Sequence, residues 1–236
     1  MSLPEEALQA LGRSFLKDES LETWTDLLDG GSIVDVPEAS EWPPDQEPQM
    51  ALVIEGLFRM TYMDNTGKMV TVRYIGPSGF MGIPGMVAGS VPISTSSLTS
   101  GRLYLANIGK FQRVARSSAR LSWMVAEFIC ERLYHTLSDL IYVQCRSIRD
   151  RLALHLREMA LQLGRATNIH LPISQQVLAD GIGTSREVVA RALREMRDEG
   201  WLETGREGIM IADIHRLPVG ELPISARYPE PGSQKS

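Results

Sequence analysis

The chain has 236 residues, of which 43% are hydrophobic and 22% charged, and its formal net charge is −5. This length predicts two domains, since a domain usually takes about 100–200 residues. The acidic balance excludes a protein that coats nucleic acid without sequence preference, because neutralising phosphates requires a basic surface. Any contact with DNA must therefore be made by a local basic region.

Membrane, secretory and metal-binding signals are lacking. No apolar run approaches the roughly 20 residues of a membrane span. The N-terminus, Met-Ser-Leu-Pro-Glu-Glu, lacks the cationic start and apolar stretch of a secretory signal, so we expect a cytoplasmic protein without a membrane partner. The two cysteines, Cys130 and Cys145, are too few for the thiolates of an iron–sulfur cluster. The four histidines are scattered along the chain, so no metal site is predicted.

The N-terminal half is predicted to be a small antiparallel β structure preceded by a helical segment. Residues 5–29 carry apolar side chains at helical spacing, whereas residues 32–105 form short β-rich segments separated by glycine and proline. The clearest feature is a hairpin within residues 51–75, for which residues 64–67 supply the turn. The prolines of residues 41–48 lack ladder donors, so a loop or an edge strand is expected there.

Residues 107–163 have a helical pattern that is interrupted near residues 145–147. Apolar residues within it alternate in steps of three and four, the spacing of a heptad seam between supercoiled helices. The predicted dimer seam consists of Trp123, Ala126, Cys130, Leu133, Leu137 and Leu140. The alternative is a helix packed on the core of its own domain, but the wide apolar circumference favours a dimer seam. The residues that would contribute to such a core are Met124, Val125, Phe128, Ile129 and Ile141.

The strongest chemical signal is a predicted helix-turn-helix in residues 174–199. Ser174 caps a short helix, glycines in residues 181–183 make the turn, and Ser185 caps a second helix. At about 100° per residue, the second helix places its apolar residues on one face. These are Val188, Val189, Ala192, Leu193 and Met196. The opposite face carries four arginines, one carboxylate and one small residue. These are Arg186, Glu187, Ala190, Arg191, Arg194 and Arg197.

The arginine-rich face predicts a helix that reads the major groove of DNA. The arginine fork can bond O6 and N7 of guanine, and a glutamate can accept a hydrogen bond from N4 of cytosine. Any amphipathic helix has an exposed polar face, but the bias toward arginine favours DNA recognition. Residues 200–204 and 209–211 predict a hairpin wing with Arg206 at its tip. Arg206 is a candidate for a phosphate contact, with a solvated loop arginine as the commoner alternative. Residues 218–236 are predicted to be a flexible tail.

Residues 173–191, ISQQVLADGIGTSREVVAR, resemble the DNA-binding signature of the cyclic-AMP receptor protein and fumarate–nitrate regulator (Crp/Fnr) family. Residues 54–60, 65–67 and 76–82 resemble the β-roll of the same family, and the resemblance covers residues 30–217. It implies an α+β fold with a cyclic-nucleotide-binding-like β-roll, a dimerisation helix and a winged helix-turn-helix. The expected boundaries are 1–118 for the sensor with its leading helix, 119–146 for the dimerisation helix, 147–217 for the DNA-binding domain and 218–236 for the tail.

The resemblance implies a sequence-specific transcription regulator and not an enzyme. Its expected partners are double-stranded DNA, a second copy of the chain and, for an activator, RNA polymerase. Arg186, Glu187 and Arg191 match the base-reading positions of the cyclic-AMP receptor branch, so the half-site is expected to be similar to TGTGA. Positions matched to contacts with the DNA backbone are Ser174, Gln176 and Ser185, and Thr184 and Arg206 are added as candidates.

The expected effector site departs from the family. Cyclic-nucleotide binders of the family carry a glutamate for the ribose and an arginine for the phosphate soon after the glycine that corresponds to Gly82, and residues 82–97 contain neither. Burying a phosphate without a cation costs several kcal/mol, so the effector is expected to differ from cyclic AMP or to be absent. The residues Met81, Ile83, Pro84 and Met86 are a candidate lining for an uncharged ligand, with plain packing as the equal alternative.

Other sensing chemistries and function classes remain alternatives at this stage, and no cofactor is predicted. None of the histidines that usually ligate haem lies in the β-roll, although ligation by cysteine or methionine is left open. Cys130 on the seam would face its symmetry mate, but a reducing cytoplasm disfavours a disulfide switch. An enzyme is disfavoured because no catalytic motif is found, and a structural interaction module would not need arginines on one helix face.

Overall fold

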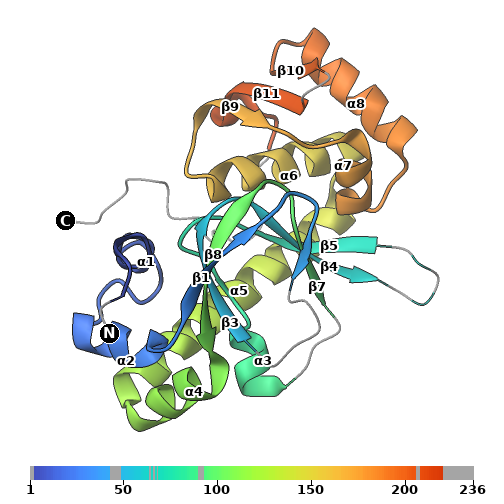
Figure 1. Ribbon diagram of the computed structural model, residues 1–236. Helices are drawn as coiled ribbons and strands as arrows, with labels where there is room; N and C mark the ends of the chain where they lie inside the picture. Colours follow the sequence, from blue (N-terminus) through green and yellow to red (C-terminus); the bar gives the residue numbers. More distant parts are fainter. Residues whose placement is uncertain are drawn as a thin grey trace. The chain divides into compact units, whose positions relative to one another are not determined.

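The computed structural model describes residues 3–42, 49–63, 65, 67, 69–89, 93–205 and 208–219. The chain forms two compact units, one of Met1–Arg59 and Ile75–Arg132, the other of Met60–Tyr74 and Leu133–Ser236. The second unit therefore contains a segment of the N-terminal half in addition to the C-terminal residues. Figure 1 labels the helices and strands of both units. None of the described helices has the length and apolar character that would let it cross a membrane.

Two short helices open the first unit, where the spacing of residues 5–29 predicted helix. They are α1 (Glu5–Leu11) and α2 (Leu21–Leu28). The Ser20 side chain caps α2 by accepting a hydrogen bond from the Thr23 amide. Trp24 Nε1 donates to the Leu16 carbonyl over 2.8 Å, so the connecting segment is tied to α2.

The described residues of the N-terminal half form two four-stranded sheets. The first has the order β1 (Ser32–Val36), β8 (Gly101–Asn107), β3 (Gln49–Glu55) and β6 (Phe80–Met81). Its antiparallel register pairs Leu105 with both Ser32 and Ala51. The second has the order β2 (Glu41–Trp42), β7 (Ser94–Ser97), β4 (Phe58–Met63) and β5 (Met69–Ile75). The predicted hairpin is confirmed as β4 and β5, and β2 is an edge strand, as the neighbouring prolines indicated.

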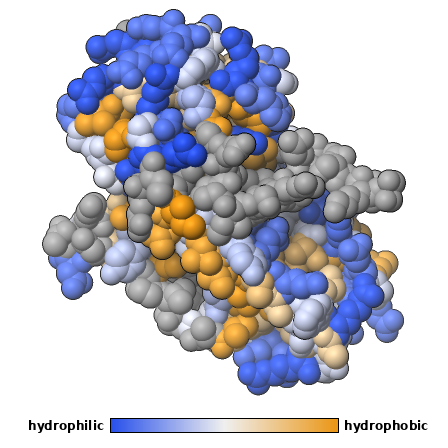
Figure 2. All heavy atoms as spheres, turned by 180° about the vertical axis from the view of Figure 1, so that it is seen from behind, coloured by the Kyte–Doolittle hydropathy of each residue, from blue (hydrophilic) through white to orange (hydrophobic). Residues whose placement is uncertain are grey.

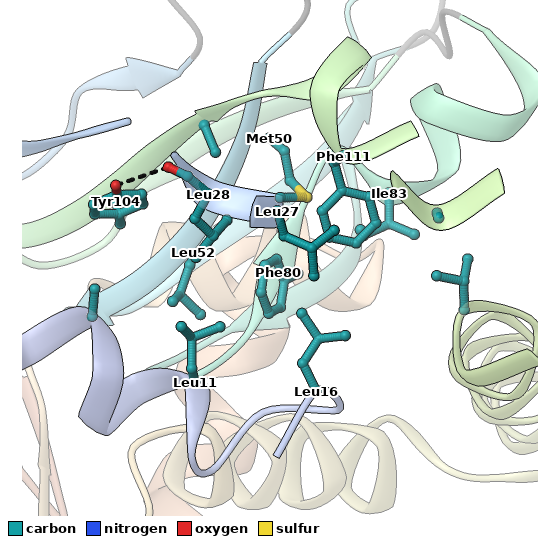
Figure 3. Packing of buried hydrophobic residues seen from close by; sticks show 14 of the residues in the cluster. Leu11, Leu16, Leu27, Leu28, Met50, Leu52, Phe80, Ile83, Tyr104 and Phe111 are labelled. Atoms are coloured by element: carbon teal, nitrogen blue, oxygen red, sulfur yellow. Dashed lines mark hydrogen bonds between the residues drawn. The ribbon is translucent and has the colours of Figure 1, made fainter. Parts of the chain in front are cut away.

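A cluster of buried apolar side chains forms the core of the first unit and joins its leading helices to its strands. Figure 3 shows leucines of the N-terminal segment, including Leu11 and Leu27, gathered with Leu52 and Phe80 of the strands. Phe111 is fully buried in the same cluster. The Tyr104 hydroxyl donates to the Leu28 carbonyl over 3.0 Å, which satisfies a polar group inside the core. The leading helices are therefore part of this core.

The predicted helical region contains three helices, α4 (Ile108–Ser117), α5 (Ala119–Cys145) and α6 (Ile148–Gln162). The break near residues 145–147 is confirmed, since Ser147 and Asp150 form a capping box that begins α6. The helical pattern alone gave no break at Ser118, although the resemblance placed a domain boundary after this residue; Ser118 has an extended conformation with φ −120° and ψ 112°. Gly164 follows α6 with φ 67°, as expected of a C-terminal glycine.

Candidate nucleic-acid interface

The helix-turn-helix lies in the second unit and consists of α7 (Gln175–Ile182) and α8 (Arg186–Asp198). Ser174 accepts a hydrogen bond from the Val177 amide over 3.2 Å, and Ser185 accepts one from the Val188 amide over 3.4 Å. Gly183 ends α7 in the left-handed conformation with φ 65°, which favours glycine. Both predicted caps are confirmed. The predicted turn over residues 181–183 was wrong in its extent, because Gly181 and Ile182 are still helical and buried.

The two faces of α8 are those that the helical angles predicted. Val189, Leu193 and Met196 are at most 1% exposed and pack into the second unit, as expected for the apolar face. Glu187 and all four arginines of α8 are exposed on the other side. Arg186, Arg191 and Arg194 form no salt bridge with another described residue. Their guanidinium groups are therefore free of the internal pairing that would compete with phosphate or a base.

Glu187 lies in the first turn of α8, between the cap and the arginines. The pKa of Glu187 is lowered mainly by a hydrogen bond from its own backbone amide. A hydrogen bond from the Ser185 side chain and the positive charge of Arg186 lower this pKa further. The carboxylate is therefore held in its ionised form, which accepts hydrogen bonds and does not donate them. This is the form required to accept a hydrogen bond from cytosine N4.

The candidate backbone-contacting residues lie around the start of each helix. Ser174 and Ser185 are exposed. The Ser174 hydroxyl accepts from an amide and still has its own proton to donate, whereas the Ser185 hydroxyl donates to the Glu187 carboxylate. Helix N-termini also attract anions through their unpaired amides. Thr184 is partly exposed, and Gln176 is exposed with its side-chain amide donating to Asp180 over 2.7 Å. Arg206 lies outside the described residues.

The wing is a three-stranded antiparallel sheet in the order β10 (Leu202–Gly205), β11 (Gly208–Asp213) and β9 (Thr167–Leu171). The hairpin of β10 and β11 was predicted, whereas β9 was missed. The sequence pattern that would predict β9 is weak, because the strand has only five residues and only Ile169 and Leu171 are buried. The sheet register pairs Ile169 with Ile211, so β9 anchors the wing to the core of the second unit.

Arg149 of α6 holds the segment where α8 meets the wing. Its guanidinium lies 4.4 Å from the centroid of the Trp201 ring and also forms a salt bridge with Glu199. A planar cation over an indole face is favourable in addition to the charge pair. The end of the arginine-bearing helix and the first residue of the wing are thus fixed to the same helix.

The six predicted seam residues are all exposed along α5. Trp123 is 68% exposed and Leu133 and Leu140 are each 55% exposed, which are high values for large apolar side chains. Hydrophobic surface forms a band on the face shown in Figure 2. Of the residues named for the alternative of core packing, Val125 and Phe128 are buried, Met124 and Ile129 are partly buried, and Ile141 is 38% exposed. α5 therefore has an apolar core face in addition to its exposed apolar face. Cys130 is exposed and forms no disulfide with another described residue, and the side chain of Cys145 is not described.

The candidate effector residues lie at β6 and at α3 (Ile83–Ala88). Met81, Ile83 and Met86 are buried, and the last two belong to the core cluster of the first unit. Pro84 is exposed in the first turn of α3. Two surface grooves, of about 880 and 480 Å³, are lined by other residues. This placement supports the packing alternative for Ile83 and Met86.

Comparisons with known proteins agree with this architecture. Residues 150–218 match the Crp-like helix-turn-helix domain. A CRP-like cAMP-activated global transcriptional regulator of Mycobacterium tuberculosis is 24% identical over 194 residues, covering 78% of this chain and 85% of the relative. The structure of FixK2 from Bradyrhizobium japonicum aligns with a TM-score of 0.70 at 19% identity, covering 81% of this chain and 98% of that one. The c-di-GMP responsive regulator CLP of Xanthomonas campestris aligns with a TM-score of 0.67 at 18% identity, covering 82% of this chain and 99% of that one.

A β-rich N-terminal unit, a long helix and a winged helix-turn-helix define a DNA-binding transcription regulator. The predicted α+β fold class is confirmed by the same comparisons. Residues 150–218 are thus a Crp-like helix-turn-helix domain, and the chain is similar to transcription regulators of the Crp/Fnr family over most of its length.

Proposed function

We propose that this Crp/Fnr regulator binds a pseudo-palindromic operator with TGTGA-like half-sites as a homodimer. The observation that carries the proposal is the exposed face of α8 with Arg186, Glu187 and Arg191. The opposite face is buried through Val189, Leu193 and Met196. Either arginine can form a bidentate pair with guanine, and the ionised Glu187 can accept from cytosine. Because the whole chain has a net charge of −5, its DNA contact must be made by a local basic region, and the arginine-bearing face of α8 is such a region.

The exposed face of α5 supports a homodimer. Leu133, Leu137 and Leu140 are between 40% and 55% exposed, and they repeat at the spacing that supercoiled helices bury between them. Apolar surface of this kind is costly in water and marks an interaction site. A dimer related by a two-fold axis would present two copies of α8 to half-sites about one helical turn apart.

Functional domains are proposed to follow residues 1–118, 119–146 and 147–217, with a tail from residue 218. The matched helix-turn-helix domain begins at residue 150, close to the start proposed for the DNA-binding part. The protein is further proposed to act in the cytoplasm without catalysing a reaction, and to contact RNA polymerase where it activates transcription.

The effector is proposed to differ from cyclic AMP, because residues 82–97 contain no arginine or glutamate and α3 turns Ile83 and Met86 into the core. The named relatives respond to different nucleotides, one to cAMP and the other to c-di-GMP. A calorimetric titration with cyclic AMP should give no saturable heat, because no cation of this segment faces the phosphate. Micromolar affinity for cyclic AMP, with stronger binding to an operator duplex in its presence, would contradict this.

The proposed function is tested by a mobility shift at fixed salt with a duplex carrying two inverted TGTGA half-sites. We expect saturable binding by one dimer per duplex and much weaker binding to a duplex of the same composition with scrambled half-sites. Size-exclusion chromatography with light scattering gives the mass of the complex. Equal affinity for both duplexes would show that the chain does not read this sequence.

A further inference from the structure

A residue of the β hairpin reaches the helix-turn-helix within the second unit. Tyr74, in β5, is 2% exposed, and its hydroxyl lies 2.8 Å from Nε2 of His155 in α6. The two rings meet edge to face, with centroids 4.9 Å apart and planes at 70°. The carboxylate of Glu158 lies 3.8 Å from Nδ1 of the same histidine. The hydrogen bond and the ring contact with Tyr74 orient the imidazole, and Glu158 lies near its other nitrogen.

This pair is packed against Gly181 of α7. A Cβ atom at Gly181 would lie 2.3 Å from His155 Nε2 and 3.2 Å from the Tyr74 hydroxyl, so only glycine leaves room for the contact. Glycine inside a helix costs about 1 kcal/mol relative to alanine. The close approach of the Tyr74–His155 pair to α7 is a physical reason for having glycine at position 181.

A second residue of α6 holds the same end of α7. Arg151, one helical turn before His155, donates from Nη2 to the Ile182 carbonyl. Burial lowers the pKa of Arg151, as expected where a guanidinium loses water. The last residues of α7 are therefore held by Arg151 and by the Tyr74–His155 pair. Only Gly183, Thr184 and Ser185 separate them from α8.

We propose that Tyr74, outside the helix-turn-helix, is a positioning residue for DNA recognition. It fixes α7 through His155 and Gly181, and α7 fixes the start of α8, where Arg186 and Glu187 stand. Reading base edges requires side chains held within fractions of an ångström, whereas contact with phosphates tolerates small displacements. Loss of the contact therefore weakens sequence discrimination more than general DNA affinity. This inference rests on the proposed function.

The test compares Tyr74→Phe with Tyr62→Phe, which removes a hydroxyl from a 43% exposed tyrosine in β4 of the same hairpin. Tyr74→Phe should weaken binding to the TGTGA duplex about two- to tenfold, the effect of one hydrogen bond. Binding to the scrambled duplex and the salt dependence of affinity should stay unchanged, and Tyr62→Phe should behave as the wild type. Equal losses on both duplexes, or no loss, would overturn the proposal.

A measurement on the free protein separates this inference from the proposed function. Hydrogen exchange of the α7 amides, Gln175–Ile182, should become faster in Tyr74→Phe and stay unchanged in Tyr62→Phe. If the wild type shows no preference for TGTGA, the proposed operator is wrong. The hydrogen-exchange result still decides whether Tyr74 stabilises α7. Unchanged exchange in α7 would overturn the role given to Tyr74.

Discussion

Replacing Arg191 by alanine should lower the affinity for a duplex with TGTGA-like half-sites by about ten- to a hundredfold for each half-site, because each subunit loses one bidentate arginine–guanine pair. Preference for guanine at the position that Arg191 reads should disappear. The side chain is exposed and forms no salt bridge with a described residue, so its removal should leave the fold intact. A mobility-shift assay at fixed salt, with each base pair of the half-site varied in turn, measures both effects.

Arg194→Ala provides the matched control for this prediction. Arg194 is equally exposed on α8 but lies outside the predicted base-reading set. It should weaken binding to all duplexes by a similar factor and lower the salt dependence, as expected of a phosphate contact. The base-reading role of Arg191 is wrong if Arg191→Ala binds with an unchanged sequence preference.

Placing a charge in the seam should separate the dimer. Leu137→Glu puts a carboxylate where two copies of α5 would meet, and burying two such charges together is strongly unfavourable. Leu137 is 40% exposed in the single chain, so the fold of the subunit should tolerate the change. Light scattering should give a monomer mass, and affinity for the two-half-site duplex should fall by about a hundredfold or more, because linked binding is lost.

Leu21→Glu is the control for Leu137→Glu. Leu21 is 60% exposed in α2 and lies outside the predicted seam. This variant should remain a dimer and keep its affinity for the operator. A dimer mass for Leu137→Glu at the same concentration would exclude this face of α5 as the subunit interface.

The features that the sequence predicted well depend on local periodicity. The burial of Val189, Leu193 and Met196 follows from the geometry of a single helix, and the caps at Ser174 and Ser185 follow from hydrogen bonds within three residues. For the same reason the hairpin of β4 and β5 was identified, since its turn chemistry lies between two adjacent runs of β-forming residues.

Features that depend on contacts between distant residues were not predictable in this way. Gly181 was assigned to a turn because glycine usually breaks a helix, and the reason for keeping it helical is its contact with His155 and Tyr74. Tyr74 and His155 are 81 residues apart, and no local pattern joins them. Likewise, the apolar side chain of Ile83 is compatible with either a ligand pocket or a packed core. Only the packing of the first unit, where Ile83 belongs to the core cluster, distinguishes these two roles.

Selection from a pool of random duplexes tests the central claim most directly, because it does not assume the operator. The purified dimer should enrich sequences that carry two TGTGA-like half-sites in inverted orientation, with centres about one helical turn apart. Arg191→Ala should enrich the same arrangement with relaxed preference at the guanine it reads. The claim is that a dimer of this chain reads DNA through Arg186, Glu187 and Arg191. It would be contradicted if the selection enriched single half-sites, an unrelated sequence, or no sequence above the starting pool.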